Sequence, residues 1–224
     1  VSEIDRLGCD YIDLLQSHIT PEDVPMSEFL GVIEDLLSEG LIRHFGVSNV
    51  SEAQLKQLNT TGRVEWVQNR LSLVHQSSYA SIRSYCIENG IRMNPYQVIE
   101  RGQLLKNCTL DSALPSTDSR SSKPEYRGDV NEVIRAWFRR TSEVASTRFG
   151  AEADDLAVGW ALAQQGVHMC VIGATSPHQI KRFLGVRAIC STDLLEFLDN
   201  AFRSLQTNVR DVYGVSVEEF RGLA

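Results

Sequence analysis

Long apolar runs are absent from this sequence, and none approaches the roughly 20 residues that a helix needs to cross a bilayer. Residues 1–5 also lack the basic start and the apolar centre of a secretory signal peptide. We therefore expect a cytoplasmic protein that has no membrane partner.

Basic charge is scarce as well. The net charge is −7, and acidic and basic residues are interspersed, so no basic stripe could neutralise a nucleic-acid backbone. Nucleic acid is therefore not expected as a partner.

Cysteine pairs of the C-x-x-C type are missing too. The five cysteines are scattered along the chain. An odd, scattered set is typical of reduced thiols rather than of a disulfide framework. We assign no metal site.

The remaining composition is that of an ordinary globular protein, with 42% apolar and 23% charged residues. A length of 224 residues suits one domain with a buried core, so residues 1–224 are predicted to form a single domain. The sequence opens at Val1, inside what reads as the end of a helix over residues 2–8. This start predicts that the natural polypeptide begins further upstream.

Short apolar runs alternate with segments of helical period, which is typical of βαβ units on a parallel sheet. Local signals mark the helix ends, among them a capping box of Ser51 with Gln54 and the glycines Gly40 and Gly90. We predict five strands, at residues 11–15, 42–47, 64–68, 91–96 and 169–172.

Residues 107–129 interrupt this alternation. The segment is rich in serine, proline and charge, has few apolar residues, and is long for a connection between a strand and a helix. Such a segment is either a surface loop or a lid that closes over a ligand.

Several motifs follow one another along the chain. Residues 7–18 read LGCDYIDLLQSH, residues 39–49 read EGLIRHFGVSN, and residues 67–69 read VQN. They resemble the aldo-keto reductase patterns L-G-x-D-Y-I-D-L-x-x-x-H, E-G-K-I-R-x-x-G-V-S-N and V-Q-x-x. Residues 90–104 and 158–176 are similar to the family's later strand segment and to the segment that closes its barrel.

This resemblance implies an α/β fold of the (βα)8 TIM-barrel type, of which five βα units are visible. By their order these units correspond to the family's fourth to eighth strands, so we expect the first three to be absent from this chain. Reactive residues of a parallel barrel gather at the C-terminal ends of the strands. The side chains that follow the five strands are therefore expected to face one pocket.

By resemblance, His18 is the family's catalytic histidine, which orients the substrate carbonyl. A neutral imidazole can donate the hydrogen bond that this role requires. Ser48, Asn49 and Gln68 resemble the residues that bind the nicotinamide carboxamide, and Tyr96 resembles the aromatic residue that stacks on the nicotinamide ring.

The resemblance places the rest of the cofactor site in two later segments. Gln97 stands where the family commonly has the serine that approaches the pyrophosphate. Arg182 is a candidate partner for the 2′-phosphate of NADP(H). The closing turn and its helix supply the other expected cofactor-binding residues, Gly173, Thr175, Ser176 and Gln179.

The family's catalytic aspartate, tyrosine and lysine have no counterpart in this sequence. The tyrosine is the proton donor, and the lysine and aspartate lower its pKa, so this chain by itself is expected to transfer hydride poorly. The closing turn also differs, with Arg182 and Phe183 where the family usually has Glu and Asn.

Three functions are compatible with these features. The first is reduction of aldehydes or ketones by NADP(H), or the reverse oxidation, with a small carbonyl compound as substrate. The second is a redox-inactive subunit that senses a cofactor or binds a partner, because five strands cannot close a barrel and their open edges call for a second copy or another subunit. The third is a lyase or isomerase that uses His18 as acid or base.

Overall fold

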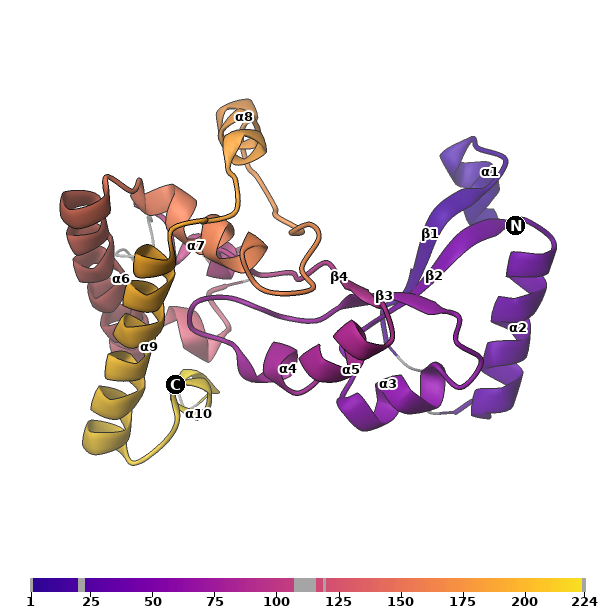
Figure 1. Cartoon of the computed structure of the whole chain (residues 1–224), viewed down its shortest axis with the longest axis horizontal. Coiled ribbons are helices and arrows are strands. Elements are labelled where there is room, and N and C mark those ends of the chain that lie inside the picture. The colour runs from indigo at the N-terminus through magenta and orange to yellow at the C-terminus, as the bar shows by residue number, and fades with distance from the viewer. Residues whose placement is uncertain (1, 20–22, 107–115, 119, 223–224) are drawn as a thin grey trace. The chain divides into compact units, whose positions relative to one another are not determined.

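The computed structural model describes residues 2–19, 23–106, 116–118 and 120–222 (Figure 1). These residues form two compact units. The first contains the described residues of Val1–Arg70, Ser77–Tyr96 and Gln165–Met169, and the second contains those of Leu71–Gln76, Gln97–Gln164 and Cys170–Ala224. The expectation of one barrel domain over residues 1–224 stays a prediction.

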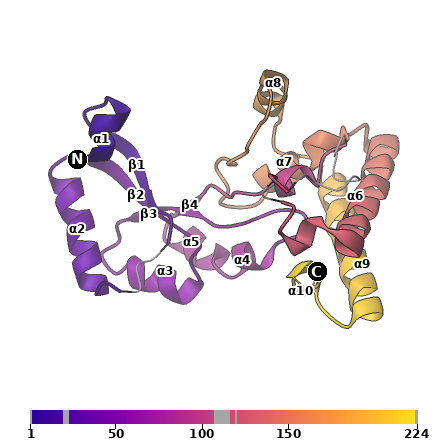
Figure 2. The ribbon, with the colours of Figure 1, turned by 180° about the vertical axis from the view of Figure 1, so that it is seen from behind.

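The first unit is built on a parallel sheet of four strands in the order β1-β2-β3-β4. The strands are β1 (Ile12–Ser17), β2 (Ile42–Ser48), β3 (Val64–Gln68) and β4 (Arg92–Met93). The unit's helices are α1 (Ser2–Leu7), α2 (Met26–Ser38), α3 (Glu52–Leu58), α4 (Ser77–Ala80) and α5 (Arg83–Glu88). α2 contacts β2 and α3, and α5 contacts β4. Figure 1 and, from behind, Figure 2 show this alternation of strand and helix, which makes the fold α/β.

Local signals end the helices of this unit where the sequence predicts. Gly40 follows α2 with φ 70°, and Gly90 follows α5 with φ 67°, a left-handed conformation that glycine adopts without strain. At the start of α3, Ser51 accepts a hydrogen bond from the Gln54 amide while the Gln54 side chain accepts one from the Ser51 amide. The predicted capping box is therefore confirmed.

Gly46, in the middle of β2, lies where two neighbouring strands approach its backbone closely. A Cβ atom added to Gly46 would stand 2.9 Å from Gln16 Cγ and 2.9 Å from the carbonyl oxygen of Trp66. The flanking residues Phe45 and Val47 are each only 1% exposed. A side chain at position 46 would therefore have to displace backbone in a packed sheet.

Replacing Gly46 by alanine is expected to lower the free energy of unfolding by about 1–3 kcal/mol, the usual effect of overpacking a core. Gly31→Ala is the matched control, because Gly31 lies within α2 and its added Cβ would meet nothing within 4 Å. That control should raise stability by about 0.5–1 kcal/mol, since alanine favours a helix over glycine. Urea unfolding of both variants checks the opposite signs, and equal effects would contradict the close approach.

The fifth predicted strand, at residues 169–172, is wrong. Met93 donates to the Gly166 carbonyl and accepts from the His168 amide, and Val167 forms one isolated bridge with Met93. To continue this parallel ladder, the residue two positions after Met93 would have to donate its N–H to the neighbouring segment. That residue is Pro95, which has no N–H. The fourth strand is also shorter than predicted. Beyond Met93, the backbone amides of Asn94 and Tyr96 still donate to the carbonyls of Val67 and Asn69, and Tyr96 forms an isolated bridge with Arg70.

The second unit is mainly helical. Its helices are α6 (Gly128–Phe149), α7 (Ala153–Leu162), α8 (Pro177–Gly185), α9 (Thr192–Tyr213) and α10 (Val217–Gly222), with short 3-10 helices η1 (Glu100–Gly102) and η2 (Pro124–Tyr126). α6 and α9 lie side by side in both Figure 1 and Figure 2. Apolar residues of α9 recur every three or four positions, which gives the helix one buried face: Leu194, Leu198, Phe202, Leu205 and Val209.

The predicted loop at residues 107–129 lies partly outside the described residues, which omit 107–115 and 119. Its described end contains η2 and the first turn of α6, and its role as a lid stays a prediction. Among the helices in the described ranges, none combines the length and the apolar character needed to cross a membrane.

Candidate functional site

Three of the predicted site residues lie at the C-terminal ends of neighbouring strands in the first unit. β2 ends at Ser48, β3 ends at Gln68, and His18 directly follows β1. Ser48 pairs with Gln68 in the β2–β3 register. The parallel sheet therefore brings these side chains to one edge, which is where reactive residues of βα barrels are found.

Ser48 and Gln68 are held by short contacts. The Ser48 hydroxyl, on a residue that is 3% exposed, donates to the Gln68 carbonyl at 2.6 Å. The backbone amide of Asn49 donates to the same carbonyl at 3.2 Å. Because the Ser48 proton is used in this bond, its oxygen remains able to accept a hydrogen bond from a ligand.

Asn49 joins the two other predicted residues of this group. Its Nδ2 donates to the carbonyl oxygen of His18 at 3.0 Å, and its Oδ1 accepts from the Tyr96 hydroxyl at 2.6 Å. Its backbone has φ 58°, in the left-handed region that asparagine tolerates better than most residues. Buried Asn69 secures the adjoining turn by bonding both the amide and the carbonyl of Val50.

A cluster of side-chain amides next to these residues was not predicted. Gln16 and Asn94 exchange two hydrogen bonds of 3.1 and 2.9 Å, and Gln68 Nε2 donates to Gln16 Oε1 at 3.2 Å. The available signal was the two-residue period of a strand. Gln16 precedes His18 by two positions and Asn94 precedes Tyr96 by two, so each shares a face with a predicted residue.

The His18 side chain is exposed, and the backbone carbonyl of this residue accepts the hydrogen bond from Asn49. An exposed imidazole can be reached by a small molecule and can donate a hydrogen bond in its neutral form. The structure thus brings His18, Ser48, Asn49, Gln68 and Tyr96 together in one unit.

The remaining predicted residues belong to the second unit. Gln97 is half-buried, has φ 56°, and accepts from the Glu100 amide through its carbonyl. Gly173 and Thr175 are exposed and precede α8. Ser176 is the N-cap of α8 and accepts from the Gln179 amide, while Gln179 Oε1 accepts from both the amide and the hydroxyl of Thr175.

Arg182, on α8, is engaged by two carboxylates of α7. Its Nη1 lies 3.4 Å from Asp154 Oδ2, and its Nη2 lies 3.0 Å from Asp155 Oδ1. Negative charges beside a guanidinium compete with any phosphate for it. A 2′-phosphate would therefore have to displace these ion pairs.

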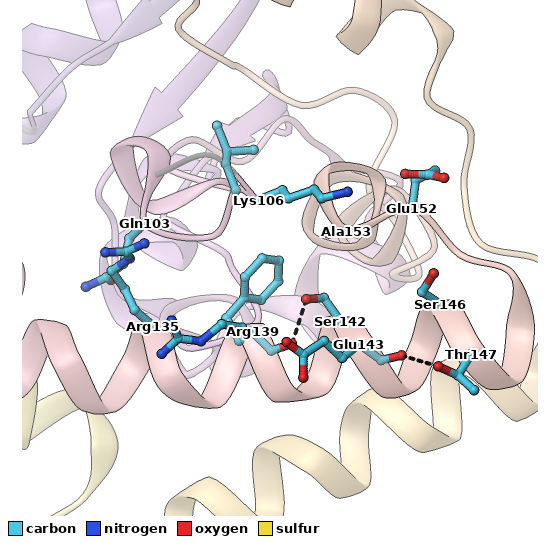
Figure 3. A pocket seen from close by; sticks show the side chains of 12 residues that line it. Gln103, Lys106, Arg135, Arg139, Ser142, Glu143, Ser146, Thr147, Glu152 and Ala153 are labelled. Carbon is cyan, nitrogen blue, oxygen red and sulfur yellow. Dashed lines mark hydrogen bonds between the residues drawn. The ribbon is translucent and has the colours of Figure 1, made fainter. Parts of the chain in front are cut away.

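A cavity of about 700 Å³ lies within the second unit, beside α6 (Figure 3). Its wall carries three cationic side chains, Lys106, Arg135 and Arg139, and two carboxylates, Glu143 and Glu152. Serine and threonine hydroxyls of α6 bond to the helix's own carbonyls, as the dashed lines in Figure 3 mark. None of the predicted site residues lines this cavity.

Two cysteine thiols of the described ranges are largely buried. Burial raises the pKa of the Cys86 thiol and of the Cys170 thiol to about 12 each, so both are protonated near neutral pH. Within those same ranges, no group of three or more His, Cys, Asp or Glu side chains is arranged to hold a metal ion.

Comparison with known proteins identifies relatives of this arrangement. The family model described as "Aldo/keto reductase family" matches residues 3–194. The aldo-keto reductase YhdN of Bacillus subtilis is 29% identical over 180 residues, which are 80% of this chain and 54% of that protein. The NADH-specific methylglyoxal reductase of Escherichia coli is 27% identical over 187 residues, 80% of this chain and 55% of that protein. The chain thus spans about half the length of these relatives.

A solved structure gives the corresponding likeness of fold. The glycerol dehydrogenase AKR11B4 from Gluconobacter oxydans superposes with a TM-score of 0.79 at 24% identity. The match covers 95% of this chain and 62% of that one. The predicted fold class, a partial (βα)8 barrel, is therefore confirmed.

Proposed function

The chain belongs to the aldo/keto reductase family, and from that premise we propose that it carries the nicotinamide-binding side of an NADP(H)-dependent oxidoreductase. The reaction is the reduction of an aldehyde or ketone, or the reverse oxidation, with a small carbonyl compound as substrate. The successive strand and helix segments of this chain are proposed to correspond to the fourth to eighth strand segments of the family barrel. The observation that carries the proposal is the group of polar side chains at the ends of β1, β2 and β3.

The hydrogen-bonding capacity of this group suits a carboxamide. Gln68 uses its Nε2 to hold Gln16 and keeps its Oε1 for a ligand's NH₂, and the Ser48 oxygen is likewise able to accept. Asn49 uses one Nδ2 proton on His18 and has a second for a carboxamide oxygen. Two acceptors and one donor match the two N–H groups and the one oxygen of the nicotinamide amide.

Tyr96 and His18 are assigned the remaining roles. A bound reduced nicotinamide would supply the hydride for the carbonyl carbon of the substrate. The hydroxyl of Tyr96 is fixed on Asn49, which orients its ring for stacking on the nicotinamide. The exposed His18 imidazole donates a hydrogen bond to the carbonyl oxygen, where negative charge develops.

Gln68→Leu tests this assignment because it removes the amide and keeps a side chain of similar size. We expect NADPH to bind about tenfold more weakly, since a neutral hydrogen bond contributes about 0.5–1.5 kcal/mol. Gln57→Leu is the matched control, because Gln57 is exposed on α3 away from the strand ends. Titration of each protein with NADPH, followed by fluorescence, measures the difference. A folded wild-type protein that binds neither NADPH nor NADH would refute the proposed function.

A further inference from the structure

A strained turn follows Tyr96 in the sequence. Gln97, Glu100 and Arg101 have φ of 56°, 47° and 50°, although none is glycine. Non-glycine residues in the left-handed region raise the free energy of the backbone, and they persist where surrounding contacts enforce them. The contacts that hold residues 97–102 therefore determine the shape of this turn.

One of these contacts is a buried ion pair with the C-terminal helix α10. Glu100 is 0% exposed and Arg221 is 4% exposed. Arg221 Nη2 lies 2.7 Å from Glu100 Oε2, and the two residues are 121 positions apart. The Ser72 hydroxyl donates to the other carboxylate oxygen of Glu100. The middle of the strained turn is thus fixed by a charge pair rather than by local sequence.

Further hydrogen bonds extend this anchor at the C-terminal end of the turn. Arg221 Nη2 also reaches Gln103 Oε1 at 3.4 Å, and Gln103 Nε2 donates to Asn131 Oδ1 at 3.0 Å. Arg120 Nη1 donates to the Arg101 carbonyl at 3.0 Å. Figure 3 shows the labelled Gln103 beside α6, the helix that carries Asn131. The C-terminal end of the turn is therefore tied to α6 and α10, and Arg101 is tied to the segment that carries Arg120.

We propose that Arg221 and Glu100 are positioning residues that hold residues 97–102 in the conformation that receives the pyrophosphate of the cofactor. The proposal rests on the proposed function and on the resemblance by which Gln97 stands where the family commonly has the serine that approaches the pyrophosphate. Loss of the pair lets the turn relax toward ordinary φ values. The backbone amides of the turn and the Gln97 side chain then no longer lie where they can bind the pyrophosphate.

The test uses two probes that represent the two parts of the cofactor. ADP-ribose bearing a 2′-phosphate contains the pyrophosphate without the nicotinamide, and reduced nicotinamide mononucleotide contains the nicotinamide without the pyrophosphate. Arg221→Met is expected to weaken binding of the first probe about tenfold and to change binding of the second less than twofold. Arg63→Met is the control, because the ion pair of Arg63 with Glu34 is exposed, and it should change neither.

Each other outcome is decisive. Unchanged binding of the ADP-ribose probe by the folded variant overturns the inference, and so does an equal loss for both probes, since that would mean a purely structural role. If Arg221→Met does not fold, the double variant Glu100→Gln/Arg221→Met, which removes both charges, carries the same comparison. A wild-type protein that binds only the mononucleotide overturns this inference and leaves the proposed function standing. A wild-type protein that binds neither probe refutes both.

Discussion

Replacing Arg221 by methionine is expected to lower the free energy of unfolding by about 3–5 kcal/mol, which is the usual effect of stranding one member of a buried ion pair. The variant removes the cation that lies 2.7 Å from the carboxylate of Glu100, a residue that is 0% exposed. Burial of a carboxylate costs free energy unless its charge stays paired and hydrogen-bonded. Urea unfolding of the variant and the wild type measures the difference.

The double variant Glu100→Gln/Arg221→Met should recover most of that stability. Arg221 Nε and Nη1 are buried without a hydrogen-bond partner, so removing both charges also removes two unsatisfied donors. Arg63→Met, at an exposed pair, should cost less than about 1 kcal/mol. A loss for Arg221→Met no larger than for Arg63→Met would show that the buried pair does not stabilise this unit.

Replacing Asn49 by alanine is expected to weaken NADPH binding by thirtyfold or more, about 2 kcal/mol. Alanine loses the bond to the His18 carbonyl and the bond from the Tyr96 hydroxyl, each of which contributes about 0.5–1.5 kcal/mol. It must also adopt φ 58°, which asparagine tolerates better. The measurement is an NADPH titration of folded variant and wild type.

Two further variants separate the contributions at this position. Asn49→Gly keeps the left-handed backbone without strain and removes only the side-chain bonds. Tyr96→Phe removes one bond and keeps the ring. Because Asn49 and Tyr96 share a hydrogen bond, the double variant Asn49→Ala/Tyr96→Phe should lose less affinity than the sum of the single variants. Strict additivity, or an Asn49→Ala effect below twofold, would contradict the role given to Asn49.

The sequence predicted the sheet well where local pattern decides it. The third strand matches its predicted bounds, Val64–Gln68, and the first two differ by one or two residues at their ends. The wrong prediction is the fifth strand, which Pro95 cannot continue to pair with because it lacks an N–H, a fact that the sequence itself shows. Whether a proline ends the pairing depends on which segment its N–H would have bonded, and that is known only once the strands are assembled into the sheet.

The residues of the candidate site were likewise predictable where the local sequence decides their position, and not where contacts between distant residues decide it. Motifs placed His18, Ser48 and Gln68 correctly at strand ends, because the end of a strand is a local feature. Glu100 and Arg221 pair with each other across 121 residues, and no periodic pattern in the sequence indicates such a pair. The engagement of Arg182 by Asp154 and Asp155 could not be predicted either, because these residues lie on two helices, α8 and α7, that are separated in the sequence.

The proposed binding of the nicotinamide carboxamide at the ends of β2 and β3 is tested most directly by NMR titration of the protein with reduced nicotinamide mononucleotide. We expect saturable shifts of the Gln68 and Asn49 side-chain amides and of the backbone amides around Ser48, with the Gln57 side chain on α3 unmoved. Saturable binding that leaves Gln68 and Asn49 unshifted, or no binding at all, would contradict it.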